Sequence, residues 1–182
     1  DVVNQKTQAV NTAHQNLHGQ QKLEQAQSSA NTEIGNLPNL TNTQKAKEKE
    51  LVNSKQTRTE VQEQLNQAKS LDSSMGALKS LVAKQPTVQK TSAYINEDQT
   101  EQSAYNDSIT MGQTIINKTA DPVLDKTLVD NAISNISTKE NALHGEQKLT
   151  TAKTEAINAL NTLADLNTPQ KEAIKTADRK ST

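Results

Sequence analysis

The apolar residues of this chain recur at the spacing of an α-helix. One stripe between residues 59 and 82 advances by three or four positions over about six turns and places its members on a single helix face. Two further stripes follow, over 97–117 and 128–143, and we expect the last of these helices to end at Gly145. The middle helix is expected to lie between breaks at Gln85-Pro86 and Asp121-Pro122. The three stripes comprise Val61, Leu65, Ala68, Leu71, Met75, Leu78 and Val82; Ala104, Tyr105, Ile109, Gly112, Ile115 and Ile116; and Leu128, Val129, Ala132, Ile133, Ile136, Lys139 and Leu143. Three helices with short connections predict a three-helix bundle.

A second kind of unit follows residue 145. Its apolar spacing predicts a helix to Leu163, then a break, with Thr168 as N-cap and Pro169 at the first helical position of the next helix. An earlier copy has a helix up to Leu37 and a second helix capped by Thr41 or Asn42. Its third helix would begin near residue 57 and must carry the 61–82 stripe. We therefore expect one long helix, about 57–84, to be shared by two bundles.

A seven-residue motif occurs twice at a fixed offset. Residues 17–23, Leu-His-Gly-Gln-Gln-Lys-Leu, return 126 positions later as Leu-His-Gly-Glu-Gln-Lys-Leu. From Thr12 to Lys49, 14 of 38 positions are identical at this offset. A fixed period is typical of repeat proteins whose units stack on their neighbours. The chain is therefore expected to be a window onto a tandem array.

Composition narrows the function classes. Twenty basic residues nearly balance 21 acidic ones, and aromatic residues make up 1% of the chain, so nucleic acid is not an expected partner. No cysteine is present, which is compatible with export, and no apolar run is long enough for a membrane span. No nucleophile–base pair, carboxylate dyad or metal cluster can be assembled, so we expect neither an enzyme nor a bound cofactor.

These motifs resemble two known module families. Residues 143–149, with Ala-Lys-Thr-Glu-Ala-Ile-Asn-Ala-Leu and Leu-Asn-Thr-Pro-Gln-Lys after them, are similar to the GA-type, albumin-binding-like module. Residues 71–78, with Ala-Tyr-Ile-Asn at 93–96 and Ala-Tyr-Asn at 104–106, look like the FIVAR module. Their alternation resembles the repeat regions of giant extracellular matrix-binding surface proteins of staphylococci.

The resemblance implies an extracellular location at the cell surface or cell wall. The expected fold is all-α, with three-helix bundles placed end to end as an elongated, monomeric rod. The expected domains are a last FIVAR-like helix at 1–18, a GA-like bundle at 19–70, a FIVAR-like bundle at 57–143 and a truncated GA-like module at 144–182. The leading hypothesis is a stiff spacer that supports envelope integrity and adhesion. The alternative is a low-affinity, multivalent adhesin for fibronectin, albumin or peptidoglycan and other glycans.

A few residues are candidates for specific roles. His18, Gly19, His144 and Gly145 recur together and are interpreted as capping or packing residues at module junctions. Tyr94 and Tyr105 could contact a partner such as a sugar, although packing residues of a helical bundle would look the same.

Metal sites and an albumin contact are not expected. His14 and His18 have zinc-ligand spacing but no third ligand, and residues 96–101 lack the glycine and terminal glutamate of a calcium loop. Acidic residues at the start of a helix explain that segment better. Residues 45–50 are interpreted as a solvated helix face, and with Gln44 and Gln56 they provide no aromatic anchor for albumin.

Overall fold

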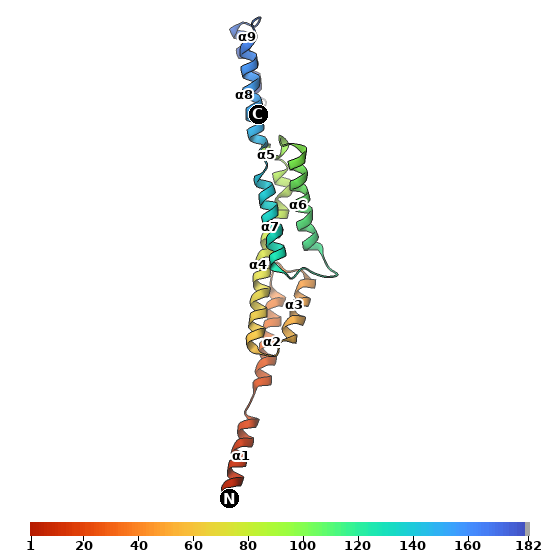
Figure 1. Cartoon of the computed structure of the whole chain (residues 1–182), viewed down its shortest axis with the longest axis vertical. Coiled ribbons are helices and arrows are strands. Elements are labelled where there is room, and N and C mark those ends of the chain that lie inside the picture. The colour runs from red at the N-terminus through yellow and green to blue at the C-terminus, as the bar shows by residue number, and fades with distance from the viewer. Residues whose placement is uncertain (181–182) are drawn as a thin grey trace. The chain divides into compact units, whose positions relative to one another are not determined.

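The computed structural model describes the backbone of residues 1–180 and the side chains of residues 1–177. Residues 181–182, the end of the expected truncated module, lie outside the described residues. Helices and no strands make up the regular structure of the described part, which confirms the all-α prediction (Figure 1). The helices are α1 (Val2–Gln15), α2 (Gly19–Asn36), α3 (Asn42–Ser54), α4 (Arg58–Val88), α5 (Ser92–Ile95), α6 (Gln99–Asn117), α7 (Lys126–Asn141), α8 (Gly145–Thr162) and α9 (Thr168–Lys180).

The chain forms two compact units. The first contains Asp1–Ser80 and Gly112–Asn131, and the second contains Leu81–Met111 and the residues from Ala132 onward. Helices α4, α6 and α7 contribute residues to both units. None of the described helices combines the length and hydropathy needed to cross a membrane.

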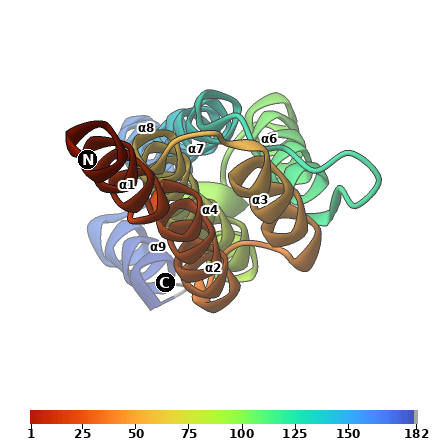
Figure 2. The ribbon, with the colours of Figure 1, turned by 90° about the horizontal axis from the view of Figure 1, so that it is seen from below.

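The core of the first unit is built from α2, α3 and the first half of α4, which are seen end-on in Figure 2. Six side chains from the three helices are almost fully buried against one another, and each valine, leucine or isoleucine among them contributes about 1.5–3 kcal/mol relative to its exposed state. They are Ala30 and Ile34 from α2, Val52 from α3, and Val61, Leu65 and Ala68 from α4. The stripe predicted for residues 61–78 therefore faces the interior, and Val82 is partly buried.

Capping boxes start the second helix of each GA-like copy. Thr41, one of the two expected caps, accepts from the Gln44 N–H at 3.2 Å, and the Gln44 side chain accepts from the Thr41 N–H. In the later copy Asn167 accepts from the Gln170 N–H at 3.0 Å and donates its own N–H to Gln170 at 2.9 Å. The prediction of Thr168 as cap is therefore wrong by one residue, because asparagine is at least as good an N-cap as threonine.

Helix α4 is longer than its sequence predicts. It begins at Arg58, where Thr57 and Glu60 exchange capping hydrogen bonds, and it continues through Pro86 to Val88. The expected break at Gln85-Pro86 is wrong. Pro86 lies in the last turn of α4, and only Thr87 and Val88 follow it in the helix. The buried Val88 side chain holds these final residues in place. The short helix α5, which no apolar stripe predicts, follows at once.

The second unit has its own buried residues. Tyr105 and Ile109 of α6, Ile136 of α7 and Leu143 after it are almost inaccessible to solvent. The ring of Tyr105 packs edge-on against that of Tyr94, with centroids 6.1 Å apart at 70°. The interior of this unit is thus formed by the residues that the later two stripes predicted.

Candidate functional site

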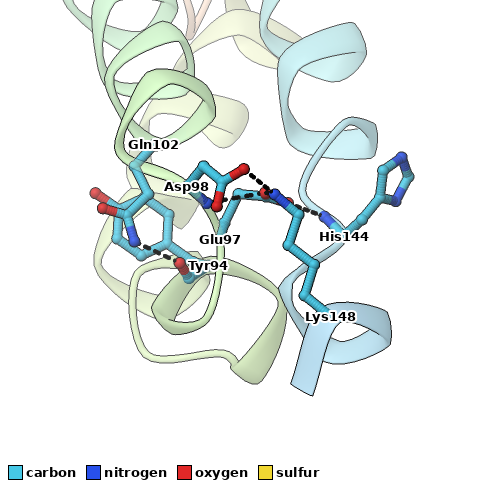
Figure 3. Close-up of polar contacts among 6 residues, drawn as sticks. All are labelled: Tyr94, Glu97, Asp98, Gln102, His144 and Lys148. Carbon is cyan, nitrogen blue, oxygen red and sulfur yellow. Dashed lines mark hydrogen bonds and ion pairs between the residues drawn. The ribbon is translucent and has the colours of Figure 1, made fainter. Parts of the chain in front are cut away.

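A buried carboxylate joins the turn before α6 to the turn before α8. The Glu97 side chain is only 1% exposed. It accepts a hydrogen bond from the Asp98 N–H at 2.9 Å and another from the His144 N–H, and it forms an ion pair with Lys148 (Figure 3). Three donors, two from separate turns and one from α8, therefore satisfy one carboxylate, as buried charges require.

Lys148 lies between two acids. Its ammonium group contacts both Glu97 and Asp98, as Figure 3 shows. The hydrogen bond from Lys148, followed by that from the Asp98 N–H, lowers the pKa of Glu97 to about 2. The same contacts, with Asp98 first, raise the pKa of Lys148 above its ordinary value. The acidic turn and the lysine therefore remain oppositely charged across the neutral pH range.

Gly145 lets the two turns approach each other. A Cβ atom at this position would lie 2.5 Å from the Ala93 carbonyl oxygen and 2.6 Å from the Glu97 nitrogen. The expectation that Gly145 ends a helix is wrong: α7 ends at Asn141, and Gly145 is the first residue of α8. Its backbone has no positive φ, so the reason for glycine is the close contact and not an unusual turn.

His144 contributes to this junction through its backbone N–H. His144 occupies the N-cap position of α8, but its imidazole makes no capping hydrogen bond and in Figure 3 points away from the acids. His18 has the same position at α2, also without a side-chain cap. No heavy atom lies within 4 Å of a Cβ built on Gly19. The two copies of the motif thus have different surroundings, and a junction role for His18 and Gly19 stays a prediction.

The acidic turn before α6 also brings several carboxylates close together, as a metal site would require. Among the described residues, Glu97, Asp98 and Glu101 are the group whose carboxylates lie close enough for a shared ion. The Lys148 ammonium already contacts the first two. His14 and His18 belong to no such group among those residues. We therefore assign no metal or cofactor site to these side chains.

The two tyrosines differ in accessibility. Tyr105 is completely buried, and burial raises its pKa to about 12, so the prediction that it contacts a partner is wrong for the folded chain. Tyr94 is half-buried, and its hydroxyl accepts from the Asn106 amide at 2.8 Å. Its carbonyl accepts from the Gln102 amide at 2.7 Å. A partner contact through Tyr94 stays a prediction.

Sequence reasoning missed a group of buried polar side chains in the first unit. Asp72 accepts from the N–H groups of Asn39 at 2.7 Å and Leu40 at 3.0 Å, and Lys79 donates to the Asn39 carbonyl at 2.7 Å. A Cβ at Gly76 would lie 2.8 Å from the Asn39 amide nitrogen. The loop between α2 and α3 is therefore fixed to α4.

Two polar residues of α3 are also buried, and one of them, Glu48, corrects the expectation of a solvated face at 45–50. Glu48 is 2% exposed and accepts from the Gln64 amide at 2.7 Å. Gln44 is 1% exposed and donates to the Val123 carbonyl at 2.7 Å. Burial raises the pKa of Glu48, and the Gln64 hydrogen bond partly opposes that shift. The spacing of apolar residues cannot identify such residues, because it assigns every polar side chain to the solvent-facing side of the helix.

Two module families match the chain. The FIVAR domain matches residues 74–144, and the GA module matches residues 20–74 and 146–177. Neither is an enzyme family. The ion pair of Glu97 with Lys148 therefore joins the interior of the FIVAR match to the start of a GA match.

Known proteins match over most of the chain. The extracellular matrix-binding protein ebh of Staphylococcus aureus strain MRSA252 is 37% identical over 173 residues, which is 95% of this chain and 2% of that protein. The crystal structure of the 756–1003 domain of EbhA from S. aureus has a TM-score of 0.90 at 28% identity, covering 96% of this chain and 71% of that one.

A second solved structure comes from work on Embp-mediated adherence of Staphylococcus epidermidis to fibronectin. It is 38% identical with a TM-score of 0.67, and the match covers 69% of this chain and 99% of that one. The expected FIVAR and GA modules and the expected extracellular, cell-surface location are confirmed by these relatives. The chain belongs to the family of extracellular matrix-binding repeat proteins of staphylococci.

Proposed function

We propose that this repeat segment acts as a stiff spacer within a cell-wall-associated surface protein, supporting envelope integrity and holding adhesive regions away from the cell. It has no catalytic role in this proposal. The proposed modules are 1–18, the last helix of a FIVAR-like bundle; 19–70, a GA-like bundle; 57–143, a FIVAR-like bundle; and 144–182, a GA-like module.

The observation that carries the proposal is the continuity of α4. The boundary between the GA and FIVAR matches falls at residue 74, in the interior of a helix of 31 residues. At 1.5 Å per residue this helix is about 46 Å long. A helix bends far less than a glycine- or serine-rich linker, so a boundary inside a helix favours a stiff connection.

Polar contacts on either side of the boundary support the same proposal. Asp72, two residues before it, binds the α2–α3 loop, and Gly76, two residues after it, lies against Asn39 of that loop. At the next boundary three residues, 142–144, separate α7 from α8, and Glu97 binds the last of them. Short connections with buried hydrogen bonds restrict bending at both places.

Small-angle scattering of the full chain tests the spacer function. A compact globule of this length would have a radius of gyration of about 16 Å. A stiff series of bundles should give a much larger value and a maximum dimension on the order of 100 Å. The control is a variant with Gly-Ser-Gly-Ser inserted after Gln67, which should broaden the distance distribution. A radius near that of the globule, or no effect of the insertion, would contradict the proposal.

A second candidate function is weak, multivalent adhesion to a matrix protein or glycan. It is favoured by the 38% identity to the Embp segment, whose parent protein mediates adherence to fibronectin. Many weak modules in one chain gain effective affinity through multivalency. Albumin is the least supported ligand, since no large hydrophobic side chain of α3 is exposed among the described residues.

Binding measurements separate the two functions. The chain would be passed over immobilised fibronectin, albumin and peptidoglycan at micromolar concentration, with a Tyr94→Ala variant as a test of the one tyrosine that is accessible. Saturable binding to any of the three supports the adhesin function. If the chain binds none of the three, the spacer function remains as the one that the chain itself performs.

A further inference from the structure

The two methionines of the chain have opposite surroundings. Met75 of α4 lies in the first unit and is 0% exposed, whereas Met111 of α6 lies in the second unit and is 58% exposed. The chain has no cysteine, so the sulfur of Met111 is its one sulfur atom in an exposed side chain. Peroxides oxidise the thioether of methionine, and they do so most readily where solvent reaches the sulfur. Met111 is therefore the sulfur that an oxidant in the medium meets first.

An amide group of the neighbouring helix is directed at this sulfur. Asn135 of α7 donates its side-chain N–H to the Met111 sulfur, and nitrogen and sulfur are 3.9 Å apart. Both residues belong to the second unit. A thioether is a weak hydrogen-bond acceptor, so this contact contributes little to stability while the sulfur is reduced. A donor is thus held in place with hardly any return from its present acceptor.

The same separation suits the oxidised side chain. A sulfoxide oxygen lies about 1.5 Å from its sulfur and accepts an N–H at about 2.9 Å, and an angle of about 120° at the oxygen then places nitrogen and sulfur about 3.9 Å apart. Asn135 already has this separation from the Met111 sulfur. Because more than half of the Met111 side chain is exposed, its end can rotate to turn the new oxygen toward the amide. Neither helix has to move.

We propose that Met111 is an oxidation site for peroxides, and that Asn135 binds the sulfoxide formed there. In the reaction with hydrogen peroxide the O–O bond breaks, and one oxygen forms a bond to the Met111 sulfur. The sulfur loses two electrons, and the other oxygen leaves as water. The same oxygen on Met75 would be a polar group in an apolar interior without a partner. The proposal concerns the chemistry of one side chain, so it holds for a spacer and for an adhesin alike.

Peptide mass mapping of the full chain after exposure to hydrogen peroxide shows where the oxygen goes. The peptide with Met111 should gain about 16 Da on the order of 100-fold faster than the peptide with Met75, because Met75 reacts only when the helices around it open. The control Met111→Leu should take up oxygen only at the slow rate of Met75. Comparable rates at the two methionines would overturn the proposal.

Melting temperatures test the role of Asn135, with peroxide exposure kept short enough to leave Met75 intact. Oxidation replaces a weak acceptor by a strong one, so the melting temperature of the wild-type chain should rise by about 2–4 °C. Asn135→Ala removes the donor, and Asn135→Asp keeps the shape of the side chain while replacing the donor by an acceptor. Oxidation should raise the melting temperature of neither variant, and it should lower that of Asn135→Asp.

Each variant is compared with its own reduced form, so the effect of the substitution itself cancels. Met111→Leu, treated in the same way, corrects for any effect of peroxide at other side chains. The same shift in the wild type and in both Asn135 variants would show that the amide does not bind the sulfoxide. That result, or the absence of a rise in the wild type, would overturn the proposal.

Discussion

Proline at position 67 would interrupt α4 near the boundary of the two matched modules. Gln67 is exposed on α4 between the buried Leu65 and Ala68, so the substitution leaves the packed face of the helix unchanged. Proline removes one backbone hydrogen bond, and its ring clashes with the carbonyl four residues earlier, at a cost of about 3 kcal/mol.

That cost is large for modules of this size. At roughly 0.05–0.15 kcal/mol per residue, the GA match over 20–74 would hold about 3–8 kcal/mol in total. The substitution therefore removes between about a third and nearly all of its stability. For so small a domain, 3 kcal/mol corresponds to a fall of roughly 10–25 °C in melting temperature.

Two reporters reveal whether the effect crosses the module boundary. Hydrogen exchange at Ile34 follows the core of the GA match, and exchange at Ile136 follows the FIVAR match. If α4 couples the modules, both should lose protection in Gln67→Pro. The control Gln67→Ala should lose none, because alanine is a strong helix former. Loss at Ile34 with Ile136 unchanged would refute the coupling and weaken the case for a stiff spacer.

Three further predictions concern the buried polar groups and the last helix. Asp72→Ala leaves the N–H groups of Asn39 and Leu40 without their acceptor and should cost about 2–4 kcal/mol in urea denaturation, whereas Ser73→Ala at the exposed neighbouring position should cost little. Burial raises the pKa of Glu48 in the folded chain above the value near 4.5 that it has in the unfolded chain. The wild-type chain should therefore lose stability as pH rises from the unfolded pKa through the folded pKa, and Glu48→Gln should not. Between about pH 4 and pH 8, the melting temperature of the variant should rise relative to that of the wild type as pH increases, and a relative fall would contradict the assignment. Amides of residues 173–177, on the largely exposed α9, should exchange on the order of 100-fold faster than those of residues 65–78, and equal protection would contradict the expected module limits.

The apolar pattern predicted most of the fold but not its polar contacts. The stripe from Val61 to Leu78 is buried, and the shared helix was expected to within a few residues. Its end was misplaced because Pro86 was taken as a break, although a proline in the last turn costs little of the helix. Glu48 was placed on a solvated face because the pattern distinguishes apolar from polar residues and cannot recognise a buried polar pair such as Glu48 and Gln64.

The junction was half visible in the sequence. Repetition of His, Gly and Lys marked residues 144, 145 and 148 as special, but their partner Glu97 lies 47 residues before His144. Nothing in local spacing links positions so far apart in the chain. The acids at 97 and 98 were interpreted as favourable charges at a helix start, and their contact with Lys148 required the folded structure.

The connection between α6 and α7 has a consequence for survival outside the cell. Residues 118–125 form the longest non-helical connection between described helices, and residues 117–121 are all exposed. Proteases bind an extended segment, and exposed loop tips provide one. Lys118, which is 45% exposed, is therefore where a trypsin-like protease should cut first. Such a cut would break the chain between α6 and α7 without interrupting a helix. The cut protein would therefore keep its fold until the bundle next opened, when the two pieces could separate.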